Sequence, residues 1–180
     1  RRFAEPARDD AWGGSDFTFG DVTLRKPKHD NHELLGKTKF AGCLGVMKDV
    51  KRNKYTQNAK IEADCSVDGK EVYKLKSTAN DANWWYDHRI SLIDAKTFAD
   101  YRTEYFKGGK HIKTIDRSWI SANLDDPRAS YWGYWYGKTN TTGHETMAFI
   151  PSTITKVNHK YKKKNLWSTS TLRKIPKKIK

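Results

Sequence analysis

The sequence has little cysteine: Cys43 and Cys65 are the only two among its 180 residues. One pair at this spacing is neither a disulfide framework nor a metal-binding motif, so we expect two reduced and partly buried thiols, with a single bridge between neighbouring strands as the alternative. Long apolar runs are also missing, since none approaches the roughly 18 residues of a membrane-spanning helix. These absences argue against a disulfide-rich scaffold and against a transmembrane helix.

The motifs of the common nucleotide and metal enzymes are missing too. The sequence contains no GxxxxGK[ST], GxGxxG, HExxH or paired CxxC motif. Its six histidines are scattered, and the best metal-binding guess, His29 and His32 beside Asp30, is explained more simply as a solvated loop. A general base beside a cation, as in His88-Arg89, is a pairing that this composition supplies by chance. We therefore expect no enzymatic activity, no metal and no cofactor.

Acidic residues are absent from the last 30 positions. The segment from Pro151 to Lys180 contains nine lysines and Arg173, in a chain whose net charge is +14. This tail supplies 10 of the 14 charges, and the first 150 residues carry only +4. The body is therefore not a strongly basic domain, which argues against a nucleic-acid-binding surface over the whole chain.

Aromatic residues are plentiful, with seven Trp, nine Tyr and seven Phe. Disordered chains are poor in aromatics, so these numbers predict a folded core. Only 36% of the residues are hydrophobic, and a thin core of this kind suits a subunit that finishes burying its surface against partners. The run from Tyr131 to Tyr136 fits a core or a protein interface better than a platform for bases or sugars.

Hydrophobic periodicity predicts mainly strands. Gly42 and Gly45 indicate a bulge or a close backbone approach, and Asp68-Gly69 indicates a hairpin turn. Phe98, Tyr101 and Tyr105 share one helical stripe, which predicts a short helix over 95–106. The predicted strands are 16–24, 38–50, 58–67, 70–77, 89–94 and the first part of 110–127.

The fold class predicted from this pattern is mainly β (α+β), a small antiparallel sheet with short helices and extended N- and C-terminal arms. We expect residues 1–35 to form the N-terminal arm and residues 36–150 a small β-rich domain. Residues 151–180 are expected to form a basic C-terminal strap.

Three short stretches, in this order, resemble one family. "GVMKDVKRNKYTQN" is similar to LVGxDxxGNKYYE, "DRSWISANLDDPR" to PEWHxWLHxxxDDPP, and "NHKYKKKNLWSTSTLRKI" to the closing NHKxNxTGTxxxYxPxSTTRKKI. That family is an accessory subunit of mitochondrial respiratory complex I, alpha subcomplex subunit 12 of NADH:ubiquinone oxidoreductase, with its assembly-factor relatives. Arg52 and Arg128 depart from the pattern, and the Thr-Gly-Thr of the third stretch is missing. The matching residues expected to be structural are Asp49, Asn53, Lys54, Tyr55, Trp119, Asp125, Asp126 and Pro127.

The resemblance implies a non-catalytic accessory or assembly subunit bound on the matrix arm of complex I, without a cofactor of its own. It implies a location on the matrix side of the mitochondrial inner membrane and iron–sulfur subunits as partners, with no small-molecule substrate. The opening "RRFA" fits the remnant of an Arg-rich targeting segment. Relative to shorter family members, an insertion is implied around 66–110.

The tail is then a strap of isolated apolar anchors with cationic spacers, which meet carboxylates of a partner or lipid head groups. A basic RNA-binding or mitochondrial ribosomal protein is the first alternative. A secreted carbohydrate-binding domain is the second, and it requires a Cys43–Cys65 bridge and a glycan on Asn140. The predicted partner-binding residues are Asn158, His159, Lys160, Tyr161, Leu166, Trp167, Arg173 and Ile175.

Overall fold

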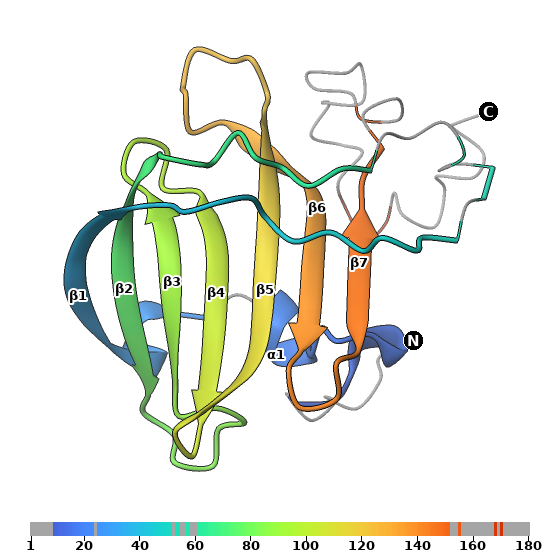
Figure 1. Cartoon of the computed structure of the whole chain (residues 1–180). Helices are drawn as coiled ribbons and strands as arrows, with labels where there is room; N and C mark the ends of the chain where they lie inside the picture. The colour runs from blue at the N-terminus through green and yellow to red at the C-terminus, as the bar shows by residue number, and fades with distance from the viewer. Residues whose placement is uncertain are drawn as a thin grey trace.

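The computed structural model describes residues 9–23, 25–51, 53, 54, 57, 61–151, 155, 168 and 170. Seven strands form one antiparallel sheet in which each strand pairs with the next along the chain (Figure 1). The strands are β1 (Asp30–Lys39), β2 (Glu71–Ala79), β3 (His88–Asp94), β4 (Asp100–Lys107), β5 (Lys110–Ser121), β6 (Ser130–Thr139) and β7 (Glu145–Phe149). Three short helices precede them, η1 (Trp12–Gly14), α1 (Phe19–Val22) and η2 (Pro27–His29).

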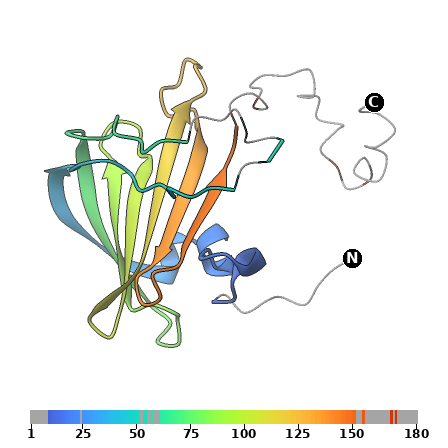
Figure 2. The same ribbon diagram turned by 45° about the vertical axis from the view of Figure 1, so that its right-hand side comes forward.

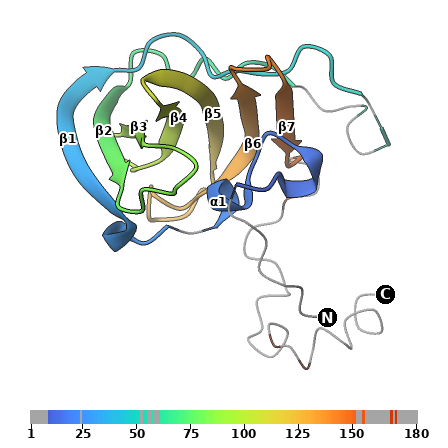
Figure 3. The ribbon, with the colours of Figure 1, turned by 90° about the horizontal axis from the view of Figure 1, so that it is seen from below.

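Period-two alternation gives the sheet two different faces. In β3, Arg89 and Ser91 point toward a pocket on the face that we call the inner face. Leu92, between Ser91 and Ile93, packs instead against a hydrophobic cluster on the opposite, outer face. The sheet is strongly curled, as the view from below shows (Figure 3).

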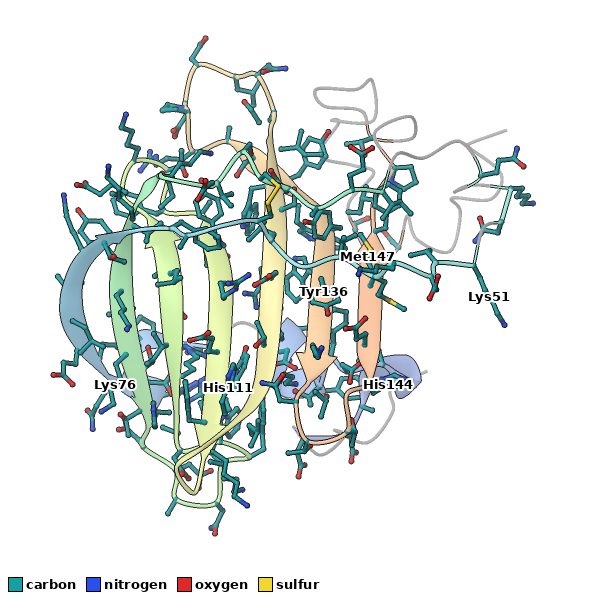
Figure 4. All side chains as sticks on the ribbon, viewed as in Figure 1. Lys51, Lys76, His111, Tyr136, His144 and Met147 are labelled. Carbon is teal, nitrogen blue, oxygen red and sulfur yellow. A yellow bond between two sulfur atoms is a disulfide. The ribbon has the colours of Figure 1, made fainter. Side chains whose placement is uncertain are left out.

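The segment 40–70 covers the outer face. It leaves β1, crosses the sheet as far as β7 and returns to β2 (Figures 1 and 2). Its Phe40, Leu44 and Val67 are each 1% exposed and pack in one cluster with residues of the sheet. Tyr136 and Met147 of that cluster lie on β6 and β7 where the segment crosses them (Figure 4).

A close backbone approach fixes the crossing segment on the sheet. A Cβ atom at Gly45 would lie 2.3 Å from the ring of Tyr136, so only glycine fits there. The Gly45 amide donates to Oδ2 of Asp116 at 2.6 Å. Asp116 also accepts two hydrogen bonds from Arg102, both 2.7 Å long, so this buried carboxylate joins the sheet to the segment. The predicted close approach at Gly45 is confirmed.

A disulfide joins Cys43 to Cys65 within the crossing segment. The expectation of two reduced, partly buried thiols is therefore wrong, and both residues are exposed. The alternative, a single bridge, is the arrangement present, although neither cysteine lies in a strand.

The N-terminal segment packs on the inner face, on the other side of the sheet from residues 40–70 (Figure 3). Phe17 is 1% exposed and makes an edge contact with Trp135, with ring centroids 5.8 Å apart. A Cβ atom at Gly137 would lie 2.9 Å from the Phe17 ring, so glycine makes room for this segment. Next to it, Thr18 and Asp21 form a capping box that starts α1.

Several predicted elements differ from the structure. Residues 16–24 contain the helix α1 instead of a strand, because the capping box of Thr18 and Asp21 satisfies the first amides of a helical turn. Residues 95–106 form a turn and then β4, not a helix. Most of 38–50, and the described part of 58–67, are irregular, because their apolar residues pack onto a sheet instead of joining it.

The predictions of a mainly β chain and of an antiparallel sheet are confirmed. The predicted strands over 70–77 and 89–94 correspond to β2 and β3. The division into 1–35, 36–150 and 151–180 stays a prediction. Within the described residues, no helix is long and apolar enough to cross a membrane.

Candidate functional site

A pocket of about 270 Å³ lies on the inner face, between the sheet and the segment that contains α1. Its walls come from five consecutive strands, β1 to β5, because the curl of the sheet brings them around one space. The lining side chains are Asp21, Thr23, Arg25, His32, Leu75, Ser77, Tyr86, Arg89, Ser91, Ile93, Asp100, Thr103, Tyr105 and Arg117.

An apolar strip leads from this pocket to the rim where β3 and β4 are joined. Leu75 and Ile93 line the pocket, and the strand register places Leu34 opposite Leu75 and Tyr73 opposite Ile93. Phe98, in the β3–β4 connection, stacks on Tyr73 with ring centroids 6.4 Å apart. Leu34 is 60% exposed and Phe98 61%. These five side chains form the apolar strip, and large exposed apolar side chains of this kind mark binding surfaces.

Two arginines that line the pocket share one carboxylate. Asp30, whose side chain is 1% exposed, accepts hydrogen bonds from Arg25 at 2.6 and 3.0 Å. Its Oδ2 also accepts one from Arg89 NH2 at 3.2 Å. Arg89 NH1 donates to the phenol oxygen of Tyr86 at 3.0 Å, and burial raises the pKa of Tyr86, which stays neutral. Burial lowers the pKa of Arg25, but the Asp30 contacts outweigh it and the net shift is upward.

A third arginine lies deeper, on β5. Arg117 NH1 lies 2.9 Å from Asp100 and donates to Thr103 Oγ1 at 3.2 Å. Its guanidinium carbon stands 4.4 Å from the centre of the Trp135 ring. Burial lowers the pKa of Arg117, but Asp100 and Tyr105 raise it more, so the cation is held. Asp100 is more exposed, at 37% against 7% for the arginine, which places the arginine inside and the carboxylate toward solvent.

A lysine on β5 fastens α1 to the inner face. Lys113 Nζ lies 2.6 Å from Asp21 Oδ2 and donates to the Asp16 carbonyl at 2.9 Å. The two charged side chains are 5% and 1% exposed. Burial lowers the pKa of Lys113, and the attraction of Asp21 opposes that shift. The ion pair therefore holds Asp21, which lines the pocket, against β5.

A histidine and a serine join β1 to β2 inside the pocket. His32 Nδ1 lies 2.9 Å from Ser77 Oγ, and its Nε2 lies 3.1 Å from the Pro27 carbonyl. The carbonyl is only an acceptor, so Nε2 carries a proton toward it. His32 was expected in a metal site or a solvated loop, whereas it holds the edge strand. The described residues contain no group of three or more metal-ligating side chains.

The predicted site residues lie elsewhere. All eight predicted partner-binding residues, and Tyr55, fall outside the described residues. Asp49 is exposed in the crossing segment, which also contains Asn53 and Lys54. Trp119 lies in β5, half-buried against the outer cluster, and its Nε1 donates to the Asp100 carbonyl at 3.0 Å.

The Asp-Asp-Pro stretch forms part of the exposed β5–β6 connection. Asp125 and Pro127 are exposed, and Asp126 pairs with Arg128 at 2.8 Å. None of the predicted structural residues that the structure describes lines the pocket, whereas His32 and Arg89, named above as candidate ligand and catalytic residues, do.

Apart from His32 and Arg89, the pocket residues were not predicted from the sequence. One signal was present: "KTIDRSW" carries Lys113, Asp116 and Arg117 within a segment predicted to be a strand. Charges on both faces of such a strand require partners, because unpaired charges are almost never fully buried. Those partners are on the N-terminal segment and on β4, and the sequence spacing does not reveal them.

Comparison with solved structures identifies three bacterial chains of similar fold. A domain assigned as an outer membrane lipoprotein-sorting protein from Vibrio parahaemolyticus superposes with a TM-score of 0.56 at 16% identity, over 88% of this chain and 57% of that one. A DUF1329 family protein from Desulfovibrio piger gives 0.56 at 12% identity, over 93% and 60%. A LolA superfamily protein from Nitrosomonas europaea gives 0.52 at 15% identity, over 84% and 60%.

These similarities establish the fold. No protein-family model matches the chain, and no curated protein matches it. The chain spans about three-fifths of the length of the solved structures that it resembles.

The resemblance to the complex I accessory subunit is wrong, because the structural neighbours are lipoprotein-sorting and LolA superfamily folds. The expected function, the iron–sulfur partners and the mitochondrial inner-membrane location fall with it. The neighbours support neither RNA binding nor carbohydrate binding. The Cys43–Cys65 bridge that the carbohydrate alternative required is present. The structural neighbours, however, are not described as carbohydrate-binding proteins.

Proposed function

We propose that this chain is a non-catalytic binding domain that holds the acyl chain of an amphiphile on the inner face of its sheet. The apolar strip is the observation that carries the proposal. It begins at Leu75 and Ile93 inside the pocket and ends at Leu34 and Phe98, which are more than half exposed. Covering such side chains is favourable, by about 0.8 kcal/mol for each methylene group buried.

The shape of the pocket supports the same reading. A pocket of about 270 Å³ is small for a whole lipid, so it accommodates one end of the ligand while the strip carries the rest. The charged groups in it are arranged in ion pairs, with Asp21 on Lys113 and Asp100 on Arg117. Charged groups paired in this way stabilise the fold or contact a ligand. We therefore propose no reaction for the domain.

The neighbours add support from the fold. One is assigned to outer membrane lipoprotein sorting, a task in which a protein handles acylated cargo. A disulfide between Cys43 and Cys65 suits an oxidising compartment, such as the envelope of a bacterium. We place the protein there as part of the same proposal.

The test is binding of 1-N-phenylnaphthylamine, a dye that becomes fluorescent in apolar sites, followed by its displacement with dodecanoate. Leu34→Asp introduces a charge into the strip, and we expect it to weaken dye binding about tenfold or more, because an apolar side chain of this size contributes about 1.5–3 kcal/mol when covered. Leu34 lies in an edge strand and is exposed, so the substitution spares the fold.

Leu124→Asp is the matched control. Leu124 is 44% exposed in the β5–β6 connection and belongs to neither the pocket nor the strip. It should bind the dye as the unaltered protein does. Equal weakening by the two substitutions, or no dye binding by the unaltered protein, would refute the proposed function.

A further inference from the structure

The ion pairs around the pocket contain more cations than carboxylates. Four cations, Arg25, Arg89, Lys113 and Arg117, face three carboxylates. Lys113 is paired with Asp21, Arg117 with Asp100, and Arg25 with Asp30. The phenols of Tyr86 and Tyr105 do not compensate, because burial raises the pKa of both and keeps them neutral. Among these four cations, Arg89 is the one without a carboxylate of its own, because it shares Asp30 with Arg25.

The hydrogen-bond geometry identifies the same residue. Asp30 is held by Arg25 through two bonds, the shorter of 2.6 Å, whereas Arg89 reaches it through a single bond of 3.2 Å. The other contact of Arg89 is to the neutral oxygen of Tyr86. A guanidinium has five N–H donors in a planar fork that matches a carboxylate or a phosphate. Within the described part of the chain, the Arg89 side chain donates only the two hydrogen bonds named above, so other N–H groups of its guanidinium remain for a ligand. The arginine lines the pocket and its side chain is only 21% exposed, so such a contact would form in a site of low dielectric.

Hydroxyl groups stand beside this arginine. Ser77 lies directly opposite Arg89 on β2, and Ser91 follows two residues along β3 on the same face. Both line the pocket together with Leu75, which is the neighbour of Ser91 across the strands. The pocket therefore changes from cationic and hydroxylic at Arg89 to apolar at Leu75 and Ile93. That order matches a molecule with an anionic end and an acyl chain.

We propose that Arg89 binds the anionic group, a carboxylate or a phosphate monoester, of the amphiphile whose acyl chain lies along the apolar strip. This inference rests on the proposed function, because it specifies the ligand of the same site. The domain then selects anionic single-headed lipids over neutral esters with the same chain. Arg89 is the selecting group. The Ser91 hydroxyl stands beside it on the same face, whereas the Ser77 hydroxyl is already used as a donor to Nδ1 of His32.

The experiment compares ligands of one chain length by dye displacement, below their micellar concentrations. Dodecanoate and dodecyl phosphate carry the anionic group, methyl dodecanoate lacks it, and inorganic phosphate lacks the chain. We expect the two anionic amphiphiles to displace the dye at concentrations about tenfold lower than the methyl ester, the usual gain from one charge-assisted contact. Inorganic phosphate alone should not displace it.

Arg89→Met tests the residue, and Arg128→Met is its control. Arg128 is 63% exposed, pairs with Asp126 and lies outside the pocket. In Arg89→Met, Asp30 keeps both bonds from Arg25, so no carboxylate is left unpaired. The preference for the anionic ligands should disappear in Arg89→Met, with binding of the methyl ester unchanged, and should persist in Arg128→Met.

The outcomes separate the two proposals. If neither dodecanoate nor its methyl ester displaces the dye, the proposed function fails. If both do so equally in the unaltered protein, or if Arg89→Met keeps the preference, binding of an acyl chain stands and the role of Arg89 is overturned. Displacement by inorganic phosphate at the concentration of dodecyl phosphate would show a free-anion site, and would also overturn the inference. The ligand comparison on the unaltered protein decides the case even if Arg89→Met does not fold.

Discussion

Removing the charge of Lys113 should destabilise the protein strongly. The Lys113–Asp21 pair is 2.6 Å long, with side chains 5% and 1% exposed. Lys113→Met leaves the Asp21 carboxylate buried without its cation, and its Oδ1 already lacks a hydrogen-bond partner. Breaking one partner of a buried ion pair costs about 3–5 kcal/mol. Thr18 still donates two hydrogen bonds to Asp21, so we expect about 3 kcal/mol, a large part of the stability of an ordinary domain.

The assay is urea unfolding followed by tryptophan fluorescence, and Lys138→Met is the control. Lys138 pairs with Glu145 at 3.3 Å, but the side chains are 44% and 32% exposed, so its loss should cost under about 1 kcal/mol. The double variant Lys113→Met with Asp21→Asn should recover part of the loss, because no buried charge remains. Equal effects of Lys113→Met and Lys138→Met would refute the reasoning that α1 is held by a buried charge.

Two further predictions concern the ties that hold the chain segments to the sheet. Burial raises the pKa of Asp16, but hydrogen bonds from Thr139, Thr146 and His144 outweigh it, and the net pKa lies below 3.8. The Asp16 carboxylate therefore stabilises the fold above about pH 4, and this stabilisation is lost as the pH falls through the folded-state pKa. In urea unfolding at pH 6, Asp16→Asn should be less stable than the unaltered protein, and the difference should shrink toward pH 2. A difference that stays constant with pH would contradict this. Replacing both disulfide cysteines by serine should lower the free energy of unfolding by about 3 kcal/mol, the cost typical of a loop of this size; a loss below about 1 kcal/mol would show that the bridge does not constrain the unfolded chain.

The strands easiest to predict from the sequence were those whose polar and apolar residues alternate. β2 and β3 were predicted because period-two patterns appear in both. Residues 95–106 were misassigned because Phe98, Tyr101 and Tyr105 also satisfy a helical stripe. In the structure, Phe98 belongs to the turn before β4, and Thr103 and Tyr105 alternate along the strand toward the pocket.

The pocket was harder to predict from the sequence, because its contacts join residues far apart in the chain. Asp30 meets Arg89 across 59 positions, and Lys113 meets Asp21 across 92. No sequence spacing or motif predicts either pairing. The apolar strip had the same difficulty, since Leu34 and Leu75 become neighbours only through the register of β1 on β2. A register depends on the whole sheet, and a local pattern does not determine it.

The position of the crossing segment in the chain has a consequence for the order of folding. Residues 40–70 separate β1 from β2, whereas the other neighbouring strands are joined by short connections. Closing a longer loop costs more conformational entropy, so the hairpins from β2 to β7 should assemble before β1 joins them. Since β1 carries Leu34 and His32, its wall of the pocket is completed last. The Cys43–Cys65 disulfide shortens the loop that must close before β1 pairs with β2. Until then, the inner face of a nascent chain stays open along the edge of β2.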